Sequence, residues 1–277
     1  MSSVARPQGE VKKWRVIVFV IVTGLLALLA LYGGVGDLLL LDGQSGFPSD
    51  IHRWHEAQSG VFTALLFGGS LLALLWRPQR KSLLVVFIAL SLALVSLAFA
   101  TVSGAGFNPL ALAIGAALIC ILVVAYPAPR ALLHFRRGGP PSYFLLVLTL
   151  IAAVLLAPII ARELNWQLLG MTAHDVHALN YHWLTSVLLA LMLILAGSLS
   201  ATKQAGWQVL SFITGAAYLY LGGAALLLPD YAGSWGVIGG VLGLLTGLGY
   251  LTATAVAVRN ARQVTGSKAA DTVSVSS

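Results

Sequence analysis

Eight long apolar runs constrain this chain more than any other feature of its sequence. They cover residues 14–32, 55–76, 82–102, 109–126, 142–160, 182–200, 209–228 and 233–256. An α-helix of about 18 or more apolar residues crosses roughly 30 Å of hydrocarbon, and these runs lack the polar face of a soluble amphipathic helix. Only 9% of the 277 residues are charged, against about 25% in soluble proteins. The sequence therefore predicts an all-α polytopic membrane protein with eight transmembrane helices.

The basic residues predict which ends of these helices face the cytoplasm. Of the 16 lysines and arginines, 14 lie around the start of the first run, after the last run, or in the turns after the second, fourth and sixth runs. Only Arg53 and Arg162 fall on the other side. Because cytoplasmic loops are rich in basic residues, both termini should be cytoplasmic and the protein should lie in a cell (inner or plasma) membrane. The net charge of +7 follows from this topology, so we expect the lipid bilayer and no nucleic acid as partner.

The two halves of the chain look like repeats of one unit. Each half has a helix, a long outer loop, a helix that opens with histidine, a short cytoplasmic turn and two further helices. A constant offset of 127 residues maps His55 onto His182 and Ser59 onto Ser186. Four helices per half keep the orientation, so the repeats should be parallel, with a pseudo-twofold axis along the membrane normal. We expect cytoplasmic tails at residues 1–13 and 263–277 and four-helix repeats at 14–138 and 139–262.

The ionisable residues collect at the predicted outer ends of the helices. No acidic or basic residue lies in the middle of a predicted helix, which argues against an ion-coupled pump because such relays use intramembrane charges. Seven of the nine acidic residues and five of the six histidines fall on the outer side. Cys120 is the only cysteine, so no intrachain disulfide can form.

Two histidine-rich segments stand at the outer ends of the second and sixth helices. Their candidate residues are His52, His55 and Glu56 in the first half and His174, Asp175, His177 and His182 in the second. Imidazole binds zinc, copper and iron, and a neighbouring carboxylate orients the ring. The five histidines are therefore candidate ligands for copper or zinc. The alternative is that these are ordinary polar residues of the membrane surface.

The layout resembles the heme A synthases of cytochrome oxidase assembly. That family also has eight helices in two parallel repeats, with a histidine opening helices 2 and 6. Here the first segment reads His52-Arg-Trp-His55-Glu56, and Asp175 precedes His182 by seven residues, similar to the family's acidic residue ahead of its helix 6 histidine. Residues 100–104, before Asn-Pro-Leu at 108–110, are similar to the family's helix 3–4 junction. The resemblance covers most of residues 14–260 and rests on pattern and topology.

The resemblance implies a heme-binding protein linked to respiratory oxidase biogenesis or electron transfer. His55 and His182 would be axial heme ligands near the outer face, and Glu56 and Asp175 would orient the imidazoles. The chain departs from the family in helices 4 and 8, where residues 112–115 and 239–241 contain no histidine in place of the family's further heme ligands. Two bis-histidine hemes, one in each half, therefore cannot form here.

Three functions stay open at this point. The chain is a heme A synthase-like protein, a non-catalytic accessory subunit of a membrane respiratory complex, or a membrane protein with an outer-face copper or zinc site. The sequence has no P-loop, no glycine-rich nucleotide turn and no recognisable Ser/His/Asp order. Whether the protein is an enzyme, and whether His55 and His182 share one site, is left open by the sequence.

Overall fold

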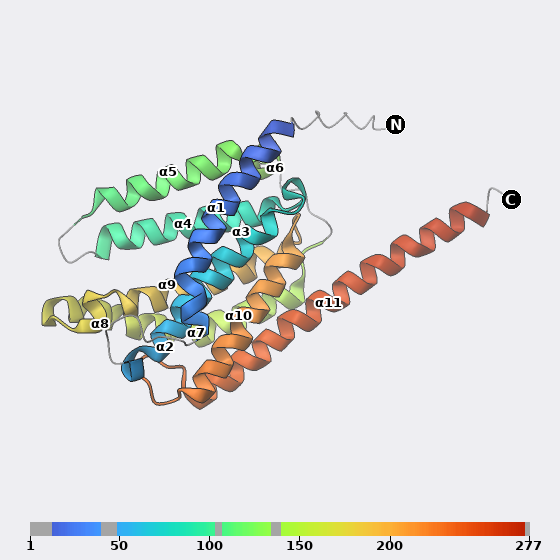
Figure 1. The fold of residues 1–277 in the computed structure, drawn as a ribbon. Coiled ribbons are helices and arrows are strands. Elements are labelled where there is room, and N and C mark those ends of the chain that lie inside the picture. Colours follow the sequence, from blue (N-terminus) through green and yellow to red (C-terminus); the bar gives the residue numbers. More distant parts are fainter. Residues whose placement is uncertain (1–12, 40–48, 103–106, 134–139, 275–277) are drawn as a thin grey trace.

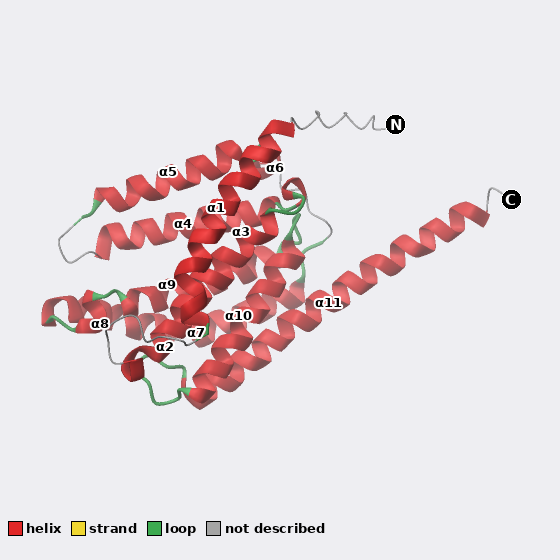
Figure 2. Ribbon diagram, viewed as in Figure 1, coloured by secondary structure: helices red, strands yellow, loops and turns green. Residues whose placement is uncertain are grey.

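The computed structural model describes residues 13–39, 49–102, 107–133 and 140–274, and every regular element within them is a helix (Figures 1 and 2). In chain order the helices are α1 (Lys13–Leu38), α2 (Ser49–Gly60), the π-helix η1 (Val61–Gly68), α3 (Gly69–Leu74), the 3₁₀ turn η2 (Pro78–Arg80), α4 (Ser82–Val102), α5 (Pro109–Ala125), α6 (Arg130–Leu133), α7 (Tyr143–Ala173), α8 (Val176–Leu179), α9 (His182–Ala201), α10 (Trp207–Leu227) and α11 (Gly236–Ser274). The all-α prediction is confirmed for the described residues.

Seven helical stretches are long and apolar enough to cross a membrane. One of them is the continuous run His52–Leu74, which passes through α2, η1 and α3. The other six are α1, α4, α7, α9, α10 and the part of α11 up to Asn260. The chain is therefore a multi-pass helical membrane protein. The helix α5 is also apolar but has 17 residues, about 26 Å of helix against roughly 30 Å of hydrocarbon. An eighth crossing at α5 stays a prediction.

The helices divide into an inner and an outer set. In the most apolar stretches of His52–Leu74, α9 and α10, 56%, 67% and 56% of the residues are buried, against 17%, 22% and 28% in α1, α7 and α11. A helix that is apolar all round and still exposed needs lipid to cover it. The inner helices therefore pack on protein, and α1, α7 and α11 present their apolar side chains to the bilayer.

The contacts between helices come in corresponding pairs. In the first half α1 packs on η1, α4 on α5, and α1 on α5; in the second half α7 packs on α9, α10 on α11, and α7 on α11. Across the halves, η1 contacts α10 and α4 contacts α9. These contacts define a correspondence between the halves in which α1 is equivalent to α7, η1 to α9, α4 to α10 and α5 to α11. Under this correspondence each contact named above has an equivalent contact in the other half, and the two contacts across the halves are equivalent to each other.

One end of the bundle carries the start of α2 together with α8, and the start of α1 and the end of α11 lie at the opposite end (Figure 1). We call the first of these the α2 end. The α11 helix continues past its apolar part, which ends at Asn260, to Ser274. Most of the predicted tail at 263–277 is therefore helical.

The predicted start of the second helix is wrong. The α2 helix begins at Ser49, six residues before His55, so that His55 does not open the helix. His182, in contrast, is the first residue of α9 as predicted. The prediction followed the apolar run alone, whereas serine and aspartate, the residue types at 49 and 50, favour helix starts and add polar turns ahead of the run.

The predicted end of the fifth helix is also wrong. The α7 helix continues through Pro158 to Ala173, thirteen residues beyond the predicted end at 160, so Arg162 and Glu163 lie on a helix and not in a loop. Residues 161–173 are rich in good helix formers. One face of this extension is buried, at Glu163, Gln167 and Gly170. Gln167 Nε2 donates to the Ala178 carbonyl at 2.8 Å, and this bond joins the extension to α8.

Candidate metal centre

Four histidines from both halves of the chain meet at the α2 end. His52 and His55 come from α2, His177 from α8 and His182 from the start of α9. We call these four residues the histidine cluster. Their ring centroids lie close together: 5.0 Å for His52–His177, 5.1 Å for His52–His182, 5.3 Å for His55–His177, 5.0 Å for His55–His182 and 5.9 Å for His177–His182. His55 and His182, which the sequence pairs by the offset of 127, therefore share one site.

In the first half, a single helix carries both histidines. His52 and His55 are three residues apart, so they lie on one face of α2, and they are only 6% and 3% exposed. Gln58 lies three residues further along the same face, and its Oε1 is 3.3 Å from His55 Nδ1. The helix thus supplies two rings and a hydrogen-bond partner for one of them.

In the second half, helix caps place the two rings. His174 ends α7 in the left-handed conformation, with φ at 58°, and Asp175 caps α8 by accepting a hydrogen bond from the Ala178 amide at 3.1 Å. Tyr181, again left-handed with φ at 58°, turns the chain into α9, where His182 is the first residue. A four-residue helix between two sharp turns brings His177 next to His182.

The ring nitrogens of His55 and His177 share one arrangement. Nδ1 of His55 faces Gln58, and Nδ1 of His177 is 3.6 Å from Asp175 Oδ1. The Nε2 atoms of both rings are buried and have no hydrogen-bond partner. In the neutral tautomer that carries its proton on Nδ1, Nε2 has a free lone pair. Histidines that bind metals have this arrangement, with the second nitrogen held by an amide or a carboxylate.

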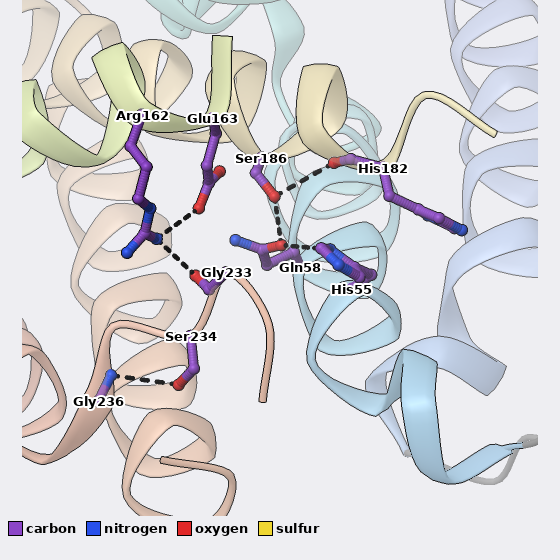
Figure 3. A network of polar contacts seen from close by, with 9 residues as sticks. All are labelled: His55, Gln58, Arg162, Glu163, His182, Ser186, Gly233, Ser234 and Gly236. Atoms are coloured by element: carbon purple, nitrogen blue, oxygen red, sulfur yellow. Dashed lines mark hydrogen bonds and ion pairs between the residues drawn. The ribbon is translucent and has the colours of Figure 1, made fainter. Parts of the chain in front are cut away.

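A polar network extends from the cluster to α7 (Figure 3). Ser186 donates its hydroxyl to Gln58 Oε1 at 2.5 Å. Glu163 is fully buried and pairs with Arg162 at 3.0 Å, and the same Arg162 Nη2 lies 3.3 Å from the Gly233 carbonyl. Figure 3 shows these side chains converging on Gln58 and Gly233 from α7 and α9. The buried carboxylate thus has a cation beside it.

Tryptophan rings enclose the cluster on one side. Trp183 meets the His55 ring edge-on at 4.9 Å, packs on Trp166 at 4.8 Å and donates from Nε1 to Asp175 Oδ2 at 3.0 Å. Burial raises the pKa of Asp175, but the hydrogen bonds from Trp183 and the Ala178 amide outweigh it, so the net pKa is lowered. Asp175 is therefore an anion that fixes both Trp183 and the start of α8.

Of the residues singled out in the sequence, the fold brings together His52, His55, His177 and His182, with Asp175 beside His177. His174 lies outside the cluster, since it is exposed at the end of α7 with Nδ1 3.3 Å from the Thr172 carbonyl. Glu56 is half-buried on α2, and Gln58 occupies the hydrogen-bonding place beside His55 that the resemblance assigns to an acid.

Sequence reasoning missed Gln58, Glu163 and Ser186. The signals were weak but present. Gln58 follows His55 at helical spacing, Ser186 follows His182 by four residues, and Glu163 is an acid on the predicted outer side. None of these patterns distinguishes a buried partner of a histidine from an ordinary polar residue at the membrane surface.

The ring spacing of the cluster suits a metal ion, although the nitrogen atoms do not yet converge. Among the residues that the structure describes, no three His, Cys, Asp or Glu side chains form a group that could hold a metal as they stand. Imidazoles bound at about 2.0–2.1 Å have ring centroids about 3 Å from the ion, hence about 5–5.5 Å from each other. The distances among His55, His177 and His182 are 5.3, 5.0 and 5.9 Å. For their nitrogens to converge on one ion, the rings would have to turn about χ2, a torsion with broad wells.

A heme does not fit between His55 and His182 as they are packed. Their rings lie 5.0 Å apart and are stacked at 17°. Two axial imidazole nitrogens on opposite sides of an iron are about 4 Å apart if the metal–nitrogen distance resembles that of zinc, which puts the ring centroids further apart than observed. Two cavities between the helices, within the part of the chain that the structure describes, are lined without any histidine.

Fold and site together define an α-helical multi-pass membrane protein with a histidine cluster at one end of its bundle. No protein-family model, no curated protein and no solved structure matches the chain. The resemblance to the heme A synthases therefore stays a prediction.

Proposed function

We propose that this protein binds a zinc or copper ion at the α2 end through His55, His177 and His182, with His52 beside them. The observation that carries the proposal is the pair of buried Nε2 atoms, on His55 and His177, that have no hydrogen-bond partner inside a group of four imidazoles. An unsatisfied buried polar atom is costly and calls for an explanation. A metal ion explains both atoms at once.

The residues of the cluster suit such an ion chemically. Imidazole is a ligand of intermediate softness that both zinc and copper accept. Gln58 lies within hydrogen-bonding distance of Nδ1 of His55, and Asp175 lies 3.6 Å from Nδ1 of His177, so that Nε2 of both rings is the nitrogen left for the metal. Three histidine ligands leave a fourth position of a tetrahedral ion open for His52, water or a small ligand. The bound ion would supply Lewis-acid chemistry at that position.

We propose with it the topology that the sequence predicts. The chain would cross a cell membrane eight times as two parallel four-helix repeats, with both termini cytoplasmic and the α2 end outside. The paired helix contacts support the repeat, because an exchange of halves preserves them. The meeting of His55 with His182 also supports it, because equivalent residues come together on a twofold axis. The positive-inside rule supports the orientation.

A metal-retention measurement tests the site. The full chain is purified in detergent, loaded with Zn²⁺ or with Cu²⁺ and dialysed against metal-free buffer. The metal content per chain is then measured by inductively coupled plasma mass spectrometry. We expect one ion per chain in the wild type and less than a tenth of that in His55→Ala and His177→Ala. His174→Ala is the matched control, because His174 comes from the same region but lies outside the cluster, and it should retain the ion. Equal metal content in all of these proteins, or none in the wild type, would overturn the proposal.

Heme is the second candidate, favoured by the paired helix architecture and by the direct meeting of His55 and His182. In that case the protein would belong to oxidase biogenesis or electron transfer, and the two rings would have to move apart to admit the macrocycle. The same preparations, expressed with heme supplied, discriminate the two. A Soret band that is lost in His55→Ala and His182→Ala but kept in His177→Ala selects heme over the metal ion.

A further inference from the structure

Two turns, one from each half, pack together at the end of the bundle opposite the α2 end. The helical run through α2, η1 and α3 and the helix α9 both start at the α2 end, so the turns that follow them lie at the other end. The Leu83 amide donates to the Ala205 carbonyl at 3.1 Å. A Cβ built on Gly206, which has φ at 100°, would lie 3.0 Å from Cα of Lys81. We call this contact the turn junction and include in it residues 77–83 and 203–206.

The turn junction is rich in positive charge. Its basic residues are Arg77, Arg80, Lys81 and Lys203. The ammonium group of Lys81 donates to the carbonyls of Ala73 and Trp76 at 2.5 Å each, so it caps the end of α3. Arg77 and Arg80 are exposed and Lys203 is half-buried. These last three residues are therefore the ones placed to contact a partner.

No acidic side chain that the structure describes offsets this charge. The acidic residues with described side chains all lie toward the α2 end: Asp37, Glu56, Glu163, Asp175 and Asp230. The pKa of Lys81 reflects the imbalance, since burial lowers it and the neighbouring charge of Arg77 lowers it further. Like charges that lie close together disfavour each other. An anion placed between them would relieve the repulsion.

Two tryptophan rings place the turn junction at the membrane surface. The guanidinium of Arg77 lies over the Trp76 ring at 5.6 Å, and the ammonium of Lys203 lies over the Trp207 ring at 5.7 Å. Trp76 is 70% exposed. Indole rings favour the headgroup region of a bilayer, where the abundant anion is the phosphate of a lipid. Arginine suits this anion because its guanidinium forms paired hydrogen bonds with phosphate oxygens.

We propose that the turn junction binds the headgroup of an anionic phospholipid, with Arg77, Arg80 and Lys203 around it. The acyl chains lie against the apolar surface beside the junction, which includes Leu72 of α3 at 45% exposure. Because the junction is built from both halves, the bound lipid joins them. The binding is independent of the histidine cluster and of its metal.

Native mass spectrometry of the full chain in detergent tests the proposal. The probes are phosphatidylglycerol and phosphatidylcholine with identical acyl chains, offered together at equal concentration. We expect the wild type to carry phosphatidylglycerol in preference. Arg77→Gln, Arg80→Gln and Lys203→Gln should each lower this preference about fivefold. Lys81 stays unchanged in every variant, because its side chain caps α3.

The matched control is Arg259→Gln. Arg259 is exposed at the same end of the bundle but belongs to α11, which packs on α10 and α7 and lies outside the turn junction. Arg53→Gln removes a charge at the α2 end. Both control variants should keep the preference of the wild type. A wild type without preference, a triple variant Arg77→Gln, Arg80→Gln, Lys203→Gln with unchanged preference, or an equal loss in Arg259→Gln would each overturn the proposal.

Discussion

The two halves of this protein use the same helix contacts but build the α2 end differently. The first half places His52 and His55 on one continuous helix, where spacing alone aligns the rings. The second half places His177 and His182 on separate elements, joined through left-handed residues and an aspartate cap. A continuous helix in one half and a capped turn in the other thus place histidines in the same site. The shared helix contacts therefore do not determine the local structure that positions each histidine.

The outer helices of the two halves differ as well. The offset of 127 maps Arg162 and Glu163 of α7 onto Val35 and Gly36 of α1, so only the second half has an ion pair there. The first half instead has a close helix approach. A Cβ built on Gly34 would lie 2.0 Å from Thr63 Oγ1 and 2.7 Å from the Ala64 nitrogen. One half relies on charge pairing and the other on backbone contact, and each difference can be tested by mutation.

The largest effect should come from breaking the ion pair of the second half. Arg162→Ala leaves the fully buried Glu163 carboxylate without its cation and should cost about 3 kcal/mol of unfolding free energy. SDS-induced unfolding in detergent micelles measures this. Because replacing both members of a buried pair is far less harmful, Arg162→Leu combined with Glu163→Leu should recover much of the loss.

The control for the ion pair is the equivalent position of the first half. Val35→Ala, at a 40% exposed site, should change the unfolding free energy by less than about 0.5 kcal/mol. If Arg162→Ala lowers the unfolding free energy no more than Val35→Ala does, the Arg162–Glu163 ion pair does not stabilise the second half in the way we expect.

A smaller effect should follow from filling the close approach of the first half. Gly34→Ala places a methyl group against the backbone nitrogen of Ala64, which cannot move without shifting η1, and overpacking of this kind costs about 1–3 kcal/mol. The equivalent residue of the second half, Ala161, is exposed, so Ala161→Leu should be nearly neutral. The same unfolding assay compares them, and equal losses would contradict the difference in packing.

The smallest effect should be a pH-dependent one at the cap of α8. The pKa of Asp175 is lowered in the folded protein, so its contribution to stability is present above the unfolded pKa of about 3.9. It is lost as the pH falls through the lower folded pKa. Asp175→Asn keeps a capping oxygen and removes only the charge, so it should cost about 0.3–1 kcal/mol at pH 7, and the difference from the wild type should shrink as the pH is lowered below about 4.

Unfolding at pH 7 and pH 3.5 measures this effect. The exposed Asp230 supplies the control variant, Asp230→Asn, for which we expect little change at either pH. A cost of Asp175→Asn that stays the same at both pH values would contradict a contribution from the carboxylate charge.

Much of the architecture was predictable because it depends on local properties of the chain. The transfer of an apolar helix into hydrocarbon is decided by about twenty consecutive residues, and the apolar runs indeed correspond to long helices, with α5 at the lower limit of length. The runs did not reveal where the helices end. Ser49 and Ala173 lie outside the apolar stretches, and the polar turns that they bound owe their conformation to helix propensity and packing.

The sequence by itself determined that this is a helical membrane protein, that its histidines gather near the ends of two helices, and that His55 and His182 correspond. Only the tertiary structure decided that His52, His55, His177 and His182 form one group, that His174 stays outside it, and that Glu163 and Gln58 belong to its surroundings. The reason is physical. Hydrophobicity acts over a local window, whereas a site built from residues more than 120 positions apart depends on how α2, α8 and α9 pack together.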